Sequence, residues 1–323
     1  MPNILLIKTS SLGDVVHNLP VVSDIRVRFP GAVVDWVVEE AYRDIVGMHP
    51  GVRRVIPVAL RRWRANLFNP SSWREFRRFR HALSAMRYDC VIDTQGLIKS
   101  ALLGRIADGT RHGYAGSSAR ESFAARFYDA RHAVARNLHA VVRNRRLAAS
   151  SLDYDVPAML DYGVRVPEGE PPPVTRPYCV LLHSTSRVDK LWPEASWQHL
   201  CGELARRSFA SVLPWGGAEE HRRSERIAKN CAMAMAPPAL SILQMARLLA
   251  GARAVVGVDT GLTHLSAALD RPVVALYCNT RPGLTGVYPS NSASARNLGE
   301  PGAMPGVDEV MAALREVAGG DFA

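Results

Sequence analysis

The sequence predicts an α/β protein with two domains, each built around a parallel β-sheet. Short apolar runs alternate with amphipathic stretches from one end of the chain to the other, which is the pattern of repeated strand–helix units. A proline-rich segment near the middle interrupts this pattern once, after which it starts again. With 323 residues, 47% of them hydrophobic, the chain can give each domain its own core.

Each expected strand is a short apolar run, and each expected helix shows apolar residues at helical spacing. In the first half, strands are expected at residues 4–7, 33–38, 55–58 and 90–94, and helices at 15–28, 73–87, 97–107 and 136–149. In the second half, strands are expected at 178–182, 211–213, 254–258 and 273–277, and helices at 194–207, 219–229, 242–250, 262–269 and 307–317.

Residues 167–173 contain three consecutive prolines, which exclude both a helix and a central strand. We interpret this segment as a linker between a first domain at residues 1–166 and a second at 174–305. The last helix, at about 306–323, is expected to pack back onto the first domain. Two such domains in series are expected to face each other across a cleft, where ligands commonly bind.

The chain carries no signal for export or for membrane insertion. Only four consecutive apolar residues precede Lys8, and no later apolar run approaches the roughly 20 residues of a membrane span. The five cysteines are scattered and never spaced as a CxxC pair, so we expect reduced core residues and neither a zinc site nor a disulfide framework. The protein is therefore expected to be cytoplasmic.

The net charge of +10 lies entirely in the first half of the chain. Up to Asp155 there are 24 Lys and Arg against 14 Asp and Glu, and beyond it 16 against 16. Nine arginines fall between Arg53 and Arg80, where Glu75 is the only acid. Such a field attracts nucleic acid, anionic lipid headgroups or a polyanionic small substrate, although a solvated basic surface would look the same.

Aromatic residues are interleaved with these arginines in the expected helix at 73–87. Its apolar stripe comprises Trp73, Phe76, Phe79, Leu83 and Met86. We expect this stripe to pack against the sheet rather than to lie on a membrane.

The first candidate for chemistry is Asp14. It follows the first expected strand through a loop of small residues, and parallel α/β folds bind ligands at the carboxyl ends of their strands. A reactive carboxylate at the start of a helix is one interpretation of this residue. A simple helix cap is the other, and the loop alone does not decide between them.

The second domain offers turns suited to a diphosphate. Asp259-Thr260-Gly261 leads from an expected strand into a helix, whose first N–H groups and dipole favour an anion, and Thr260, Thr263 and His264 could add donors. The loop from His183 to Trp192 supplies hydroxyls and Lys190, and Glu220 follows a third strand, where it could accept from ribose hydroxyls. A helix cap or a polar surface loop would look similar in each case.

Other catalytic patterns are poorly supported. The sequence holds no Walker A motif, GxSxG elbow, HExxH, or GxGxxG after a strand. Asp153-Tyr154-Asp155 has the DxD spacing of metal-dependent sugar transferases, but it lies away from any expected strand end. We therefore expect no metal site, and the diphosphate would be stabilised by helix termini and Lys190.

Several ordered motifs resemble the heptosyltransferases of bacterial lipopolysaccharide core synthesis, and the likeness covers nearly the whole chain. They are Lys8-Thr9-Ser10-Ser11-Leu12-Gly13-Asp14, Asp35-Trp36-Val37-Val38-Glu39-Glu40, Arg61-Arg62-Trp63-Arg64, Asp93-Thr94-Gln95-Gly96-Leu97-Ile98-Lys99-Ser100, and the Asp189-Lys190 and Asp259-Thr260-Gly261 turns. Within the family, the enzymes that add the first heptose are more similar than those that add the second. One departure is Thr280-Arg281-Pro282-Gly283, where the resemblance leads us to expect an acid near Arg281.

The resemblance implies a GT-B fold, with two Rossmann-like domains, and an inverting glycosyl transfer without metal or other cofactor. The implied donor is ADP-L-glycero-β-D-manno-heptose, and the acceptor is the Kdo of Kdo2-lipid A. The protein would be a monomer, bound peripherally to the anionic cytoplasmic face of the inner membrane, with no nucleic-acid partner. A second-heptose transferase, a GT-B sugar-nucleotide epimerase and a basic nucleic-acid-binding protein are the alternatives.

The resemblance also implies roles for particular residues. Asp14 would be the catalytic base, and Lys190 would stabilise the leaving diphosphate. The donor would be held by Ser10, Gly13, Thr185, Ser186, Lys190, Glu220, Asp259, Thr260, Gly261, Leu262 and His264. The acceptor carboxylates and phosphates would be faced by Lys8, Arg61, Arg62, Arg64 and Arg120.

Overall fold

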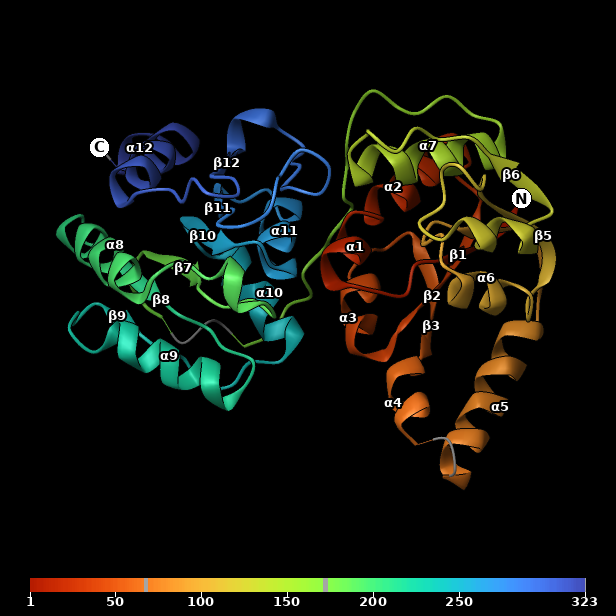
Figure 1. Ribbon diagram of the computed structural model, residues 1–323, viewed down its shortest axis with the longest axis horizontal. Helices are drawn as coiled ribbons and strands as arrows, with labels where there is room; N and C mark the ends of the chain where they lie inside the picture. Colours follow the sequence, from red (N-terminus) through yellow and green to blue (C-terminus); the bar gives the residue numbers. More distant parts are fainter. Residues whose placement is uncertain (67–68, 171–173, 323) are drawn as a thin grey trace. The chain divides into compact units, whose positions relative to one another are not determined.

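The computed structural model describes residues 1–66, 69–170 and 174–322, which form two compact units, Met1–Arg165 and Val166–Ala323. Each unit contains a six-stranded sheet in which every adjacent pair of strands is parallel (Figure 1). The predicted α/β class with two parallel sheets is confirmed. Three prolines of the expected linker, Pro171 to Pro173, lie outside the described residues.

The sheet of the first unit has the order β3-β2-β1-β4-β5-β6. Its strands are β1 (Asn3–Ile7), β2 (Val33–Glu39), β3 (Val52–Val58), β4 (Arg87–Asp93), β5 (Asp108–Tyr114) and β6 (Ala130–His132). Ile4 to Ile7 are fully buried, because helices cover both faces of the sheet. The sequence pattern missed β5 and β6, since both are polar strands at one side of the sheet and lack a continuous apolar run.

The helices of the first unit are α1 (Leu12–Val16), α2 (Leu19–Arg28), α3 (Arg43–Gly47), α4 (Leu60–Ala65), α5 (Pro70–Ser84), α6 (Ile98–Gly104) and α7 (Ala140–Leu152). The single helix expected at residues 15–28 is wrong, because the chain forms α1 and α2 instead. Pro20 lies at the second position of α2, where a proline starts a helix readily but cannot continue a preceding one.

The two faces of this sheet have different covers. Leu5, Ile7 and Val37 belong to a core that also contains Trp63 of α4, Phe79 and Leu83 of α5, and Leu103 of α6. On α2 and α7, which contact each other, Arg145 donates to both oxygens of Asp24 at 2.7 and 2.8 Å. This buried ion pair joins the two helices side by side (Figure 1).

The second unit repeats the same topology in the order β12-β11-β10-β7-β8-β9. Its strands are β7 (Tyr178–Leu182), β8 (Ala210–Val212), β9 (Ala234–Met235), β10 (Ala254–Val258), β11 (Val273–Leu276) and β12 (Ala295–Leu298). Its helices are α8 (Glu194–Arg206), α9 (Ala218–Ala228), α10 (Ile242–Ala250), α11 (Gly261–Ala268) and α12 (Val307–Ala318). The sequence pattern missed β9 and β12, which are short strands at the outer edges of this sheet.

The expectation that the last helix packs onto the first domain is wrong. α12 contacts α8, β11 and β12, and its residues Val310, Met311 and Leu314 belong to the core of the second unit. Phe322, which follows α12, is fully buried and stacks on Phe209 at a centroid distance of 4.6 Å. These apolar side chains hold the end of the chain in the second unit because that core is where they are removed from water.

A buried polar network fixes part of the basic stretch within the fold. Asp35 of β2 is fully buried and accepts hydrogen bonds from Arg53, Arg54 and Tyr88 at 2.7 to 3.1 Å. Burial alone would raise the pKa of Asp35, but these donors outweigh it and lower the pKa. Two of the nine arginines of the basic stretch therefore compensate a buried carboxylate within the sheet.

Among the described residues, no helix combines the length and the hydropathy that a membrane span requires.

Each unit also contains a buried histidine that the fold keeps neutral. His49 lies 3.0 Å from Ser23 Oγ, and His183 lies 2.8 Å from Ser224 Oγ. Burial lowers the pKa of each imidazole to about 4. The unfolded chain, with an ordinary histidine pKa near 6.5, binds a proton more readily, so stability is complete above about pH 6.5 and falls as the pH drops toward 4.

We predict that replacing His49 with Gln removes part of this acid sensitivity. At pH 5 the buried neutral imidazole should cost about 2 kcal/mol of stability relative to pH 7. Urea unfolding at the two pH values measures the difference, which should shrink by about that amount in His49→Gln. The exposed His81→Gln is the matched control, and an acid dependence equal in the two variants would contradict the assignment.

Candidate active site

In both units several of the predicted residues lie where the strand order reverses. This reversal falls between β1 and β4 in the first sheet and between β7 and β10 in the second. At such a point neighbouring connections leave in opposite directions, and a crevice opens at the carboxyl ends of the two strands. In the first unit, Asp14 follows β1 and Asp93 is the last residue of β4. In the second unit, Lys190 follows β7 and Asp259 follows β10.

Asp14 lies in the first turn of α1 and is held from two sides. The backbone N–H of Ser11 donates to Oδ2 at 3.1 Å, and Arg120 Nη1 approaches the same oxygen to 3.3 Å. The Asp14 side chain is 15% exposed, so one part of the carboxylate still reaches the surface. The residue is thus both a helix-start acceptor and a reachable carboxylate, and the two interpretations of its sequence context are compatible.

The loop before Asp14 is fastened by the loop after β4. Gln95 Oε1 accepts from the backbone N–H groups of Thr9 and Ser10 at 3.0 and 3.2 Å. Asp93 holds Gln95 in turn, because its Oδ1 accepts from the N–H groups of Gln95 and Gly96 at 2.8 and 3.2 Å. Ser10 is therefore a backbone contact of this loop, while Gly13 lies partly buried within α1.

The Asp93 carboxylate is the buried centre of this arrangement. Its Oδ2 accepts from the hydroxyls of Ser100 and Tyr128, both at 2.7 Å. Burial raises the pKa of Asp93, and the four donors oppose that shift. Gly96 has φ +68°, a conformation that favours glycine, and this allows the chain to turn around the carboxylate.

Lys8 lies beneath the loop rather than on the surface. It is 5% exposed, and its Nζ donates to the carbonyl of Thr94 at 2.9 Å. Burial lowers the pKa of Lys8, an effect that the nearby Asp14 carboxylate opposes. Its charge therefore acts on Asp14 from within the fold.

The three arginines of α4 differ in their surroundings. Arg61 and Arg64 are exposed. Arg62 instead forms ion pairs with Glu40 at 2.8 Å and Glu75 at 2.7 Å, which raise its pKa. The positive charge of Arg62 is balanced by these two carboxylates, so an acceptor anion would have to compete with them.

In the second unit, Asp259 is the point where several predicted donor residues meet. Lys190 Nζ donates to Oδ2 at 2.6 Å, and His264 Nε2 lies 3.8 Å from Oδ1. Burial would raise the pKa of Asp259, but His264 and Lys190 outweigh it and hold the pKa well below its ordinary value. Thr185 Oγ1 donates to the Asp259 carbonyl at 3.1 Å, which ties the β7 loop to the turn after β10.

The remaining predicted donor residues surround this turn or follow β8. Thr260 precedes α11, and Gly261 and Leu262 begin it, so their N–H groups belong to a first turn that lacks intrahelical acceptors. Ser186 is exposed on the β7 loop. Glu220, in the first turn of α9, accepts from the N–H of Gly216 at 2.7 Å.

Two residues of these sites escaped sequence reasoning. Gln95 belongs to the motif at residues 93–100, but nothing in the sequence indicated that its side chain reaches the loop after β1. Thr280 donates to Asp259 Oδ2 at 3.1 Å and lies in the segment where an acid was expected near Arg281. A hydroxyl donor there suits a carboxylate, whereas another acid would repel it.

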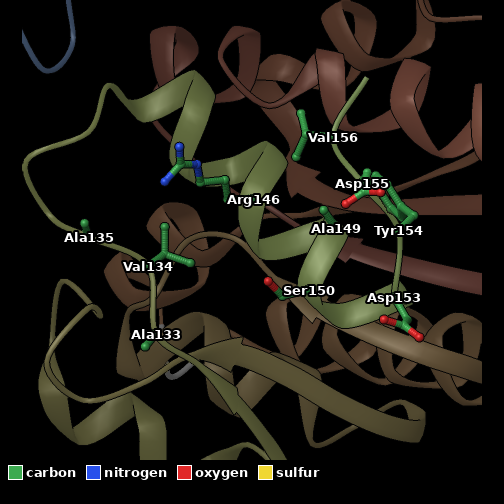
Figure 2. Close-up of a pocket in the computed structure, with 10 residues that line it drawn as sticks. All are labelled: Ala133, Val134, Ala135, Arg146, Ala149, Ser150, Asp153, Tyr154, Asp155 and Val156. Atoms are coloured by element: carbon green, nitrogen blue, oxygen red, sulfur yellow. The ribbon is translucent and has the colours of Figure 1, made fainter. Parts of the chain in front are cut away.

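The DxD sequence lies at a different place in the first unit. Asp153, Tyr154 and Asp155 line a cavity of about 490 Å3 beside the end of α7, and the two carboxylates there do not point toward each other (Figure 2). Asp153 ends α7 with φ 54°, so its backbone serves as the helix terminus. Among the described residues, no three His, Cys, Asp or Glu side chains gather as a metal would require.

Comparison with known proteins assigns the family. The family model described as glycosyltransferase family 9 (heptosyltransferase) matches residues 76–311. The chain belongs to this family. It is 48% identical over 290 residues to lipopolysaccharide heptosyltransferase 1 of Pseudomonas aeruginosa, covering 88% of this chain and 81% of that protein.

Solved structures of family members agree with the fold. The E. coli heptosyltransferase WaaC with ADP superposes with a TM-score of 0.89 at 42% identity, covering 98% of this chain and all of that one. The same enzyme with ADP-2-deoxy-2-fluoro heptose gives 0.85 at 41% identity, covering 97% and 99%. The chain is therefore a glycosyltransferase with the GT-B fold.

We predict that Asp93→Ala loosens the loop before Asp14. Four buried donors would lose their acceptor, and each unsatisfied donor costs about 1–3 kcal/mol, so the free energy of unfolding should fall by at least 3 kcal/mol. Hydrogen exchange at the Thr9 and Ser10 amides should accelerate as well. The exposed Asp108→Ala is the control, and the prediction fails if the two variants have equal stability and equal exchange.

Proposed function

We propose that the chain transfers L-glycero-D-manno-heptose from ADP-L-glycero-β-D-manno-heptose to the Kdo of Kdo2-lipid A, as a lipopolysaccharide heptosyltransferase I. The observation that carries this proposal is the chemistry of each unit: the first holds a reachable carboxylate, Asp14, and the second holds a cation, Lys190, at the turn before α11. Glycosyl transfer from a nucleotide sugar needs these two groups. The similar E. coli enzyme with ADP and with an ADP-heptose analogue supports the nature of the donor.

In the proposed reaction, Asp14 acts as general base. The acceptor hydroxyl oxygen forms a bond to the anomeric carbon of the heptose, and its proton passes to the Asp14 carboxylate. The bond from the anomeric carbon to the ADP oxygen breaks on the opposite face, so the configuration inverts. Arg120 lies 3.3 Å from the carboxylate and orients it until an acceptor enters.

Lys190 and the α11 terminus stabilise the leaving ADP. As the bond to the anomeric carbon breaks, negative charge grows on the diphosphate, and a preorganised cation and free N–H groups lower the energy of that state. Asp259 holds the Lys190 side chain in place before the donor binds, and Thr280 and His264 in turn hold the Asp259 carboxylate. The chemistry assigned to these groups involves no metal ion or other cofactor.

For the acceptor we propose the basic residues of the first unit. Arg61, Arg64 and Arg120 are exposed and suit carboxylates and phosphates, and Lys8 contributes positive charge from beneath the loop. Arg62 would bind the acceptor only if it gave up its ion pair with Glu40 or Glu75. For the donor, Ser10, Gly13, Thr185, Ser186, Glu220, Thr260, Gly261, Leu262 and His264 complete the proposed set.

Because the proposed acceptor is embedded in a bilayer, the protein has to reach the cytoplasmic face of the inner membrane. We propose that it does so as a peripheral monomer held by its basic first unit, in which all of the net charge lies.

The direct test is ADP release from ADP-heptose in the presence of Kdo2-lipid A. Release should require both substrates and should persist in EDTA, while UDP- and GDP-sugars should not replace the donor. ADP release that needs an acceptor already carrying the first heptose would indicate a second-heptose transferase. Turnover of the donor without any acceptor would indicate a hydrolase or an epimerase.

We predict that Asp14→Asn lowers kcat by about 10²- to 10⁴-fold, the usual contribution of a general base. The affinity for ADP-heptose should change little, because Asp14 serves the acceptor hydroxyl. Steady-state kinetics and calorimetric titration of the donor measure the two effects, with Asp108→Asn as the control. A variant that kept the wild-type kcat would rule out the base assignment.

We predict that Lys190→Ala both weakens ADP binding and lowers kcat. Loss of a charge-assisted hydrogen bond to a phosphate should raise the Kd for ADP by about tenfold or more. Arg187→Ala is a matched control, because Arg187 lies on the same loop and is paired with Asp189. Equal ADP affinity in the wild type and Lys190→Ala would remove Lys190 from the diphosphate site.

A further inference from the structure

The exposed face of α5 collects positive charge on one side of the helix. Trp73, Arg74, Arg77, Arg78, Arg80 and His81 are all exposed. At 100° per residue these positions fall within one arc of the helix, and the opposite arc holds Phe76, Phe79 and Leu83. We call the six exposed residues the α5 face.

No acid lies on the α5 face. Glu75, the one acidic residue of the helix, points to the other side, where it accepts from Arg62 at 2.7 Å and from Trp63 Nε1 at 2.9 Å. Within the described chain, none of the four arginines of the face forms an ion pair. Arg78 still feels the nearby Glu75 carboxylate, whereas the charges of Arg74, Arg77 and Arg80 are presented to the surroundings.

Trp73 does not join the core stripe to which the sequence assigned it. Its side chain is 56% exposed, whereas Phe79 and Leu83 are buried in the core of the first unit and Phe76 and Met86 pack against that core. A large indole among exposed arginines suits a boundary between water and hydrocarbon, because its ring is apolar while its N–H can still find a polar partner.

The helix that carries the α5 face packs at an edge of the sheet. α5 contacts β3, the outermost strand, and Phe76 and Phe79 meet Trp63 of α4 edge to face at centroid distances of 5.7 and 5.9 Å. Figure 1 shows α4 and α5 side by side at this edge. One side of α5 thus packs into the first unit, while the six residues of the α5 face are exposed.

We propose that the α5 face docks on an anionic phospholipid bilayer, with its arginines at the phosphates and the Trp73 indole at the level of the headgroups. This inference rests on the proposed function, whose acceptor is a lipid, and it assigns the docking to one helix. A polyanion without an apolar layer, such as a nucleic acid, would explain the arginines but not the exposed indole among them.

The first test is sedimentation with vesicles of phosphatidylglycerol and phosphatidylcholine, using the full chain. Reversal of two charges on the face, Arg77→Glu with Arg80→Glu, should weaken vesicle binding by tenfold or more. Arg105→Glu with Arg315→Glu changes the net charge equally at two other exposed arginines, one just after α6 and one on α12, and should leave most of the affinity. Equal loss in the two double variants would overturn the proposal.

The second test concerns the indole. Addition of the anionic vesicles should shift tryptophan emission to shorter wavelength, and Trp73→Phe should abolish most of that shift without changing the circular dichroism spectrum. A shift that survives in Trp73→Phe would refute the proposed docking geometry. A DNA duplex that binds more tightly than the vesicles at physiological salt, through the same arginines, would overturn the choice of a membrane.

ADP release separates this inference from the proposed function. With a water-soluble, deacylated Kdo acceptor, the Arg77→Glu and Arg80→Glu double variant should turn over like the wild type. With Kdo2-lipid A in vesicles it should be at least several-fold slower, and an equal rate would overturn the docking role. If the wild type used neither acceptor, the proposed function would fail, whereas the vesicle-binding results would still decide whether the α5 face docks.

Discussion

The reversal of strand order in each sheet is the constraint on which the candidate site depends. In both units, the two central strands send their connecting helices to opposite faces, so the residues just past their carboxyl ends are left beside a crevice. Asp14 and Asp93 occupy that position in the first unit, and Lys190 and Asp259 in the second. The pairing of β1 with β4, and of β7 with β10, keeps the carboxyl ends of these four strands in register.

Each candidate reactive group is already paired with an opposite charge. Asp14 meets Arg120 at 3.3 Å, and Lys190 meets Asp259 at 2.6 Å, with both members of the second pair mostly buried. Such pairs hold the side chains in place, and they must rearrange when a substrate takes over one partner. Under the proposed function, acceptor and donor would each exchange a protein ion pair for a contact with substrate.

The nine arginines between Arg53 and Arg80 have three different roles, which the sequence alone does not distinguish. Arg53 and Arg54 neutralise the buried Asp35, and Arg62 joins Glu40 to Glu75. The arginines that remain exposed on α4 and α5 carry the external field. A run of like charges in the sequence therefore overstates the positive charge that a ligand or membrane meets at the surface. Some of its arginines form ion pairs with carboxylates elsewhere in the first unit.

The sequence by itself determined the α/β class, the two parallel sheets and the strand ends at which Asp14, Lys190 and Asp259 occur, because apolar periodicity and small-residue turns are local signals. Only the tertiary structure decided that Gln95 and Asp93 fasten the loop before Asp14, that Thr280 reaches Asp259, and that α12 belongs to the second unit. It also turned Trp73 away from the core stripe. Most of these outcomes depend on contacts between residues far apart in the chain, and such contacts leave no periodic trace in the sequence.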